Sequence, residues 1–118
     1  MPADDKSANA LLRIVIAPGV AIGPGKAALL KGIKETGSIS AAGRRMGMSY
    51  KRAWYLVESL NGHFSTPLVE AKKGGKSGGG AELTVLGDEV LSAYLEMEQL
   101  TEKAIAPVLR RLLRKSAR

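Results

Sequence analysis

The 118 residues of this chain carry a formal net charge of +7, 45% of them are hydrophobic, and none is cysteine. This length and apolar content suit one compact domain and exclude a disordered tail, while the lack of cysteine excludes disulfides and thiolate metal sites. The positive charge favours a polyanionic partner, nucleic acid before an anionic membrane. No apolar run reaches the roughly 20 residues of a membrane span, and the acidic start is unlike a signal peptide. We therefore expect a cytoplasmic protein with no membrane partner.

The N-terminal part of the chain is expected to hold one strand followed by one helix. Residues 1–10 are polar, and we expect them to be frayed. Residues 11–17, LLRIVIA, predict a strand that Pro18 and Gly19 end. A helix should then run from about Pro24 to Thr36, with Gly37 as its stop. The expected core-facing residues of this helix are Ala28, Leu29, Leu30 and Ile33.

Residues 37–60, GSISAAGRRMGMSYKRAWYLVESL, have the pattern of two short helices joined by a turn. We expect the first helix over residues 40–46 and the second over residues 50–61. Gly47 permits the sharp turn, and Ser49 can cap the second helix. A helix that is buried on one side, with basic and aromatic groups at its exposed start, suits the major groove of DNA. The apolar face of this second helix is formed by Ala53, Leu56, Val57 and Leu60.

Basic, aromatic and hydroxyl side chains surround this turn, and residues 37–57 contain no acidic residue. We expect Arg52 to read a base edge, and Arg44 and Arg45 to hold phosphates. Tyr50 suits a phosphate contact or packing at the helix edge equally well, and Trp54 is expected in the core. The alternative is an ordinary solvated helix face, which the turn glycine and the caps disfavour. The predicted DNA-contacting residues of this region are Ser40, Arg44, Arg45, Ser49, Tyr50, Lys51, Arg52 and Tyr55.

After Pro67 the pattern becomes that of a β-hairpin. Residues 68–72 and 81–85 read as two strands, and KGGKSGGG, residues 73–80, reads as their glycine-rich tip. A hairpin in this position is the wing of a winged helix. We expect it to lie along DNA phosphates through Lys72, Lys73 and Lys76.

The wing also contains Gly-Lys-Ser, the end of a nucleotide phosphate-binding loop. Such a loop needs a glycine where Glu70 stands, and a helix after the serine, whereas a strand is expected here. The nucleotide interpretation is therefore disfavoured.

The C-terminal part predicts a long helix that begins near Thr84 and continues to about Ile105. Pro107 should bend or interrupt it before a basic amphipathic segment over residues 108–115. Apolar residues at alternating spacings of four and three form a coiled-coil seam, which favours a homodimer. Alternatively, this helix folds back over the domain beside the N-terminal strand. The predicted dimer-interface residues are Leu86, Val90, Ala93, Met97, Leu100 and Ala104.

The expected fold is mainly α with a small β wing, a winged helix-turn-helix plus a long C-terminal helix. We expect a flexible N-terminus over residues 1–10 and a winged helix-turn-helix DNA-binding domain over residues 11–83. A dimerisation helix and basic tail should occupy residues 84–118.

These motifs resemble the N-terminal DNA-binding domain of the ModE family of molybdate-responsive bacterial regulators. The resemblance runs from about Ile22 to Glu98. It is densest in GSIS, in SYK followed by AW, in the wing GGKSGGGAELT, and at Gly87. It implies a winged helix that dimerises through flanking helices. In that family molybdate sites lie in separate C-terminal β-barrel modules, and this sequence ends at Arg118. We expect no small-molecule ligand or cofactor within these residues.

The sequence thus predicts a bacterial transcription regulator that binds double-stranded DNA, at a palindromic operator, as a homodimer. The alternative is a winged-helix adaptor whose basic face meets an acidic protein partner, and the uninterrupted basic character of residues 37–57 disfavours it. The only histidine, His63, reads as a turn residue and no metal site is expected. No grouping of acids, bases and nucleophiles suggests catalysis, so we expect no enzyme.

Overall fold

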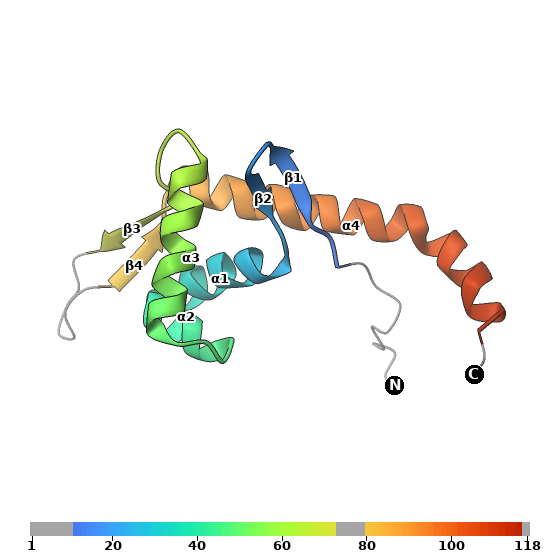
Figure 1. Ribbon diagram of the computed structural model, residues 1–118, viewed down its shortest axis with the longest axis horizontal. Coiled ribbons are helices and arrows are strands. Elements are labelled where there is room, and N and C mark those ends of the chain that lie inside the picture. Colours follow the sequence, from blue (N-terminus) through green and yellow to red (C-terminus); the bar gives the residue numbers. More distant parts are fainter. Residues whose placement is uncertain (1–10, 73–79, 117–118) are drawn as a thin grey trace.

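The computed structural model describes residues 11–72 and 80–116 and has a winged helix-turn-helix fold, which confirms the predicted fold class (Figure 1). The molecule measures 55 × 33 × 22 Å, and its long axis follows the last helix, which projects beyond the other elements (Figure 1). In chain order the elements are β1 (Ile14–Ala17), β2 (Val20–Ile22), α1 (Pro24–Thr36), α2 (Ile39–Arg45), α3 (Tyr50–His63), β3 (Val69–Lys72), β4 (Gly80–Leu83) and α4 (Val85–Arg114).

The N-terminal strand has a partner that the sequence analysis missed. β1 pairs antiparallel with β2, and Ile14 lies opposite Ile22. Pro18 and Gly19 are therefore the turn of a hairpin, and Gly19 takes a φ of 78° that suits glycine. The hydroxyl of Tyr94 on α4 donates to the carbonyl of Leu12 at 2.5 Å, which ties this end of the chain to α4.

Helix α1 has the predicted bounds because both of its end signals are local. Pro24 stands at the first helical position, and Gly37 follows the helix with a φ of 74° and donates its N–H to the carbonyl of Ile33. Leu29, Leu30 and Ile33 are buried as predicted, whereas Ala28 is exposed and Ala27 is buried in its place. Residues 27, 30 and 33 share one face of the helix at this spacing.

The helix-turn-helix has the predicted turn glycine and helix caps, with small shifts of the helix ends. Helix α2 begins one residue earlier than predicted, because Ser38 caps it by accepting from the N–H of Ala41 at 3.0 Å. Gly47 forms the turn with a φ of 70°, and Ser49 caps α3 by accepting from the N–H of Arg52 at 3.1 Å. Helix α3 continues past the predicted end to His63.

Asn61, where α3 was predicted to end, lies within the helix and joins it to the wing. Its side-chain oxygen accepts from the N–H groups of Leu68 at 2.9 Å and Val69 at 3.1 Å, and its amide donates to the carbonyl of Val69 at 3.1 Å. Strands β3 and β4 pair antiparallel, and Ala81 donates its N–H to the carbonyl of Gly37 at 3.0 Å. The base of the wing is thus fixed to α3 and to the end of α1.

Helix α4 is continuous from Val85 to Arg114 with Pro107 inside it, so the predicted end near Ile105 was wrong. A proline removes its own N–H and crowds one carbonyl of the preceding turn, which bends a helix without having to end it. Figure 1 shows α4 curving toward its C-terminal end. Thr84 caps α4 as predicted, by accepting from the N–H of Gly87 at 3.0 Å.

The core lies between α1, α2, α3, the base of the wing and the inner face of α4. No polar or charged residue in the described part of the chain is buried. Among the described residues, no helix has the length and apolar character needed to cross a membrane. The largest fully buried side chains are Leu29, Leu30, Ile33, Val57, Leu60, Leu68 and Tyr94.

Candidate nucleic-acid interface

Helix α3 buries one face and presents the opposite face to solvent. Ala53, Val57 and Leu60 are buried, whereas Lys51 and Tyr55 are exposed. Residues 51 and 55 are one helical turn apart, so both lie on the side opposite the core. The Tyr55 side chain is 62% exposed. A protruding helix with this exposed face has the shape that the major groove of DNA admits.

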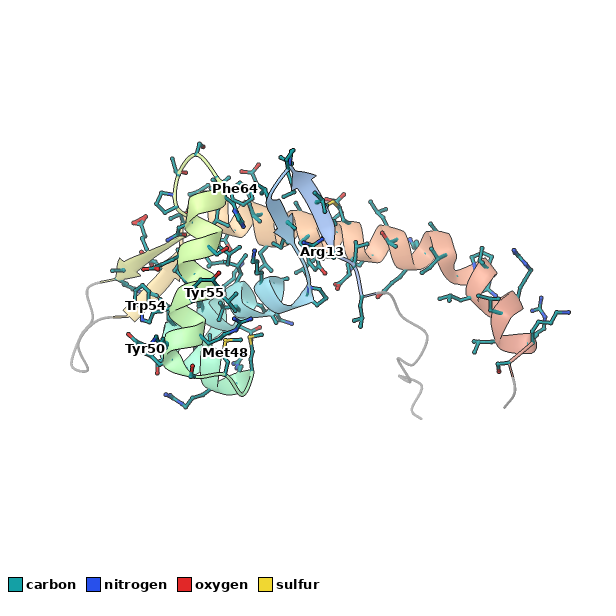
Figure 2. All side chains as sticks on the ribbon, viewed as in Figure 1. Arg13, Met48, Tyr50, Trp54, Tyr55 and Phe64 are labelled. Carbon is teal, nitrogen blue, oxygen red and sulfur yellow. The ribbon has the colours of Figure 1, made fainter. Side chains whose placement is uncertain are left out.

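Two aromatic rings stand on the edge of α3 that is nearest the wing (Figure 2). Tyr50 and Trp54 meet edge to face with their ring centres 6.2 Å apart. Trp54 is 39% exposed, so its predicted place in the core was wrong: the inward positions of this turn belong to Ala53 and Val57. The two rings border a hollow of about 380 Å³ whose other lining residues are Ser38, Ile39, Ser40, Ala71, Gly80 and Ala81.

The two arginines that precede the turn have different surroundings. Arg44 is exposed and donates to the hydroxyl of Ser40 at 2.9 Å, which leaves its charge available. Arg45 forms an ion pair with Glu35 of α1 at 2.5 Å. The hydrogen bond from Arg45 lowers the pKa of the Glu35 carboxyl, so the pair stays charged. The pair joins two different helices, so no short sequence pattern indicates it.

The described base of the wing has a mixed charge. Lys72 is exposed and its amino group lies 3.9 Å from a carboxylate oxygen of Glu82, while Glu70 stands opposite Glu82 in the strand pairing. The predicted contacts Lys73 and Lys76 lie outside the described residues.

The other flank of α3 borders a cleft that no sequence motif indicated. Arg13, Lys26 and Arg52 line this cleft, which has a volume of about 300 Å³. We call it the cationic cleft. Its three basic residues come from the approach to β1, from α1 and from α3, so only the fold brings them together. No local signal would have found Arg13 and Lys26.

His63 ends α3 beside Lys26. The amino group of Lys26 lies 3.2 Å from Nε2 of His63, and the hydroxyl of Ser59 lies 3.4 Å from the same atom. Partial burial lowers the pKa of His63, and the charge of Lys26 lowers it further. Within residues 11–72 and 80–116, no three His, Cys, Asp or Glu side chains gather as a metal ion would need.

The predicted seam of α4 divides into two parts. Leu86, Val90, Ala93 and Met97 line a groove of about 490 Å³ together with β1, β2 and the end of α3. We call it the apolar groove. Leu100 is 59% exposed and Ala104 is also exposed, both beyond this groove. The remaining lining residues of the apolar groove are Ile14, Ile16, Ile22, Phe64, Glu89 and Tyr94.

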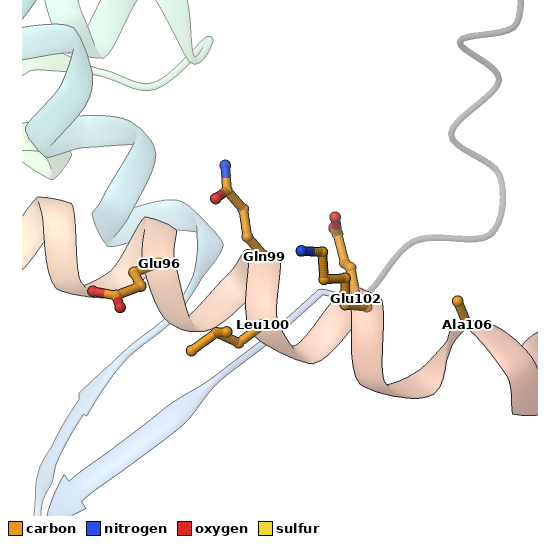
Figure 3. A pocket seen from close by; sticks show the side chains of 6 residues that line it. Glu96, Gln99, Leu100, Glu102 and Ala106 are labelled. Carbon is orange, nitrogen blue, oxygen red and sulfur yellow. The ribbon is translucent and has the colours of Figure 1, made fainter.

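A shallow hollow of about 480 Å³ lies further along α4 (Figure 3). Leu100 stands in it between Glu96 and Lys103, the charged residues one turn before and after. The other lining residues are Gln99, Glu102 and Ala106.

These features define a winged helix-turn-helix protein with an exposed second helix of the motif. The chain belongs to the family described as bacterial regulatory helix-turn-helix protein, lysR family, whose model matches residues 26–88. This match begins in α1, covers the helix-turn-helix and the wing, and ends in the first turn of α4.

The curated relatives that the chain resembles include transcriptional regulators and molybdenum-pterin-binding proteins. The chain is 44% identical over 88 residues to the molybdenum-pterin-binding protein MopB of Rhodobacter capsulatus, covering 75% of this chain and 33% of that protein. It is 37% identical over 99 residues to the transcriptional regulator ModE of Haemophilus influenzae, covering 84% of this chain and 39% of that protein. It is 37% identical over 97 residues to the DNA-binding transcriptional dual regulator ModE of Escherichia coli strain K12, covering 82% of this chain and 37% of that protein. The aligned part thus spans between a third and two fifths of these relatives.

Proposed function

We propose that this chain is the DNA-binding part of a bacterial transcription regulator and that α3 reads sequence in the major groove. The observation that carries the proposal is the outer face of α3, where Lys51 and Tyr55 protrude opposite a fully buried face. A lysine at this position can donate to guanine O6 and N7. The tyrosine hydroxyl can donate to a phosphate oxygen, and it can donate to or accept from a base. Such a regulator acts in the cytoplasm, where bacterial DNA lies.

The remaining predicted contacts of the helix pair suit the DNA backbone. Arg44 has no ion-pair partner among the described residues, so it is available for a phosphate. Arg45 already pairs with Glu35 and should contribute less. Ser40, Ser49 and Tyr50 lie at the starts of α2 and α3 and can donate hydroxyl protons to phosphate oxygens.

We further propose that α4 joins two copies of the chain, so that residues 84–118 form the dimerisation unit and residues 11–83 the DNA-binding unit. The apolar groove and the exposed Leu100 support this division, because one copy of the chain leaves both open to solvent. Glu96 and Lys103 flank Leu100 as charged residues flank the seam of a coiled coil. A two-fold dimer would bind a palindromic operator.

The relatives suggest the process that is regulated. The names ModE and molybdenum-pterin-binding protein connect them with transcriptional control and with molybdenum. We propose that the genes controlled by this chain serve molybdenum metabolism.

The test is selection of bound duplexes from a random DNA library by the purified chain. The proposal expects enrichment of one motif with two half-sites related by two-fold symmetry. The exposed rings of Tyr50, Trp54 and Tyr55 would also suit a protein partner. If no motif is enriched and duplex binding has no sequence preference, the adaptor function replaces the proposed one.

A further inference from the structure

The cationic cleft beside α3 carries an inference about Arg13 and Lys26, residues outside the helix-turn-helix. Arg13 precedes β1, Lys26 lies in the first turn of α1, and Arg52 lies in the first turn of α3. All three line the same cleft of about 300 Å³. Its other lining residues are apolar or glycine, namely Ala21, Gly23, Gly25, Met48 and Leu56. Three basic residues therefore border a space that no acidic residue lines.

None of these charges is neutralised within the described part of the chain. The ion pairs found there involve Lys34, Arg45 and Lys72. Lys26 is held in place instead, because its amino group donates to the carbonyl of Ala21 at 3.2 Å and lies 3.2 Å from Nε2 of His63. The Ala21 carbonyl is neutral, so this hydrogen bond holds Lys26 in place without supplying a counter-charge for it.

The cleft lies on the side of α3 that is opposite the wing. On a helix with 3.6 residues per turn, Arg52 points about 100° to one side of Lys51, and Tyr50 points about 100° to the other. Figure 2 shows Tyr50 and Trp54 on the wing side of α3 and Arg13 on the other side. With α3 in the major groove, the two sugar-phosphate backbones that border the groove lie on these two sides.

We propose that the cationic cleft holds a phosphate of the DNA backbone on the border of the major groove opposite the wing. This inference rests on the proposed DNA binding and adds Arg13 and Lys26 to the interface. It also changes the role of Arg52, which the sequence analysis expected to read a base edge and which belongs with the phosphate contacts. Phosphate contacts position a protein on DNA without reading its sequence.

The test compares the salt dependence of duplex binding by the intact chain and by Arg13→Ala. Each phosphate contact contributes about 0.9 to the slope of log K against log salt, so this variant should lose about 0.9 of slope. If that contact contributes nothing to affinity at 1 M salt, then at 0.1 M salt Arg13→Ala should bind the duplex about eightfold more weakly than the intact chain. The loss should be equal for a selected duplex and for a random one. Arg110→Ala removes the same charge from the distal part of α4 and should change neither quantity.

A second measurement uses duplexes in which single phosphates are replaced by neutral methylphosphonates. Replacement at one phosphate should weaken binding of the intact chain and leave binding of Arg13→Ala unchanged. If Arg13→Ala keeps the slope of log K against log salt of the intact chain, and the intact chain binds its selected duplex, the inference is wrong and the proposed function stands. A wild-type chain that shows no sequence preference instead overturns the proposed function.

A free anion could fill the same cleft, and titration of inorganic phosphate distinguishes the two sources. If Arg13→Ala abolishes phosphate binding to the free protein but leaves the DNA slope intact, the cleft is a small-anion site and the DNA contact is wrong. If both change together, the cleft recognises phosphate and DNA supplies it.

Discussion

Replacement of Gly87 by alanine should strongly destabilise the protein, because this position joins α4 to the base of the wing. A Cβ built on Gly87 would lie 2.1 Å from the carbonyl oxygen of Leu68 and 3.2 Å from Cβ of Leu83. The same Leu68 oxygen accepts the N–H of Thr84 at 2.9 Å, and the hydroxyl of Thr84 caps α4 through the N–H of Gly87. The backbone oxygen cannot rotate away, so α4 must move away from Leu68.

The expected cost follows from two contributions. Overpacking a close contact costs about 1–3 kcal/mol, and loss of the Thr84 hydrogen bond costs about 1 kcal/mol. We therefore expect Gly87→Ala to lower the free energy of unfolding by about 2–4 kcal/mol. Urea denaturation followed by circular dichroism at one fixed protein concentration measures this.

Gly62 provides the matched control, because it lies in the last turn of α3 with nothing within 4 Å of a built Cβ. Gly62→Ala should raise the free energy of unfolding by about 0.5–1 kcal/mol through helix propensity alone. A Gly87→Ala variant as stable as the wild type would show that α4 does not pack on Leu68 as described.

Four further predictions concern the wing, the histidine, the dimer and the ligand. Asn61→Ala removes three hydrogen bonds to the backbone of Leu68 and Val69, so it should lower the free energy of unfolding by about 2–4 kcal/mol, measured by urea denaturation. The lowered pKa of His63 means that the unfolded chain binds a proton more readily. His63 therefore makes stability fall as the pH drops below its ordinary pKa of 6.5, and this dependence should be smaller in His63→Asn, measured by thermal denaturation between pH 7.5 and 5. Leu100→Asp should shift the chain toward monomer in sedimentation experiments without lowering helix content, because that side chain is 59% exposed. A dimer fraction equal to that of the wild type would show that Leu100 lies outside the dimer interface. Millimolar molybdate should give no more heat in isothermal titration than sulfate, since the anion-binding surfaces proposed above serve DNA; a stoichiometric, molybdate-selective heat would contradict this.

Features with local signals were predictable from the sequence. Pro24 and Gly37 bound α1, Gly47 forms the turn, and Ser49 and Thr84 cap their helices, each as expected. These residues act through φ angles or through hydrogen bonds a few positions away, so the sequence pattern is sufficient evidence for them.

Features set by tertiary packing were missed. β2 is only three residues long, too short for a strand pattern, and it exists because β1 pairs with it. Trp54 lies at the edge of the buried face, and the packing of Ala53 and Val57 against the core leaves it partly exposed. The Arg45–Glu35 pair and the cationic cleft join residues from separate elements, which no short motif can indicate.

The central claim is that the outer face of α3 reads bases, and the Lys51→Ala variant tests it most directly. The measurement is the ratio of affinities for the selected duplex and a random duplex, at one salt concentration. We predict that Lys51→Ala lowers this ratio by about 5–150-fold, which corresponds to about 1–3 kcal/mol for one base contact. Lys103→Ala, which removes the same charge from α4, should leave the ratio unchanged. Equal weakening on both duplexes, or no weakening at all, would contradict base reading by α3.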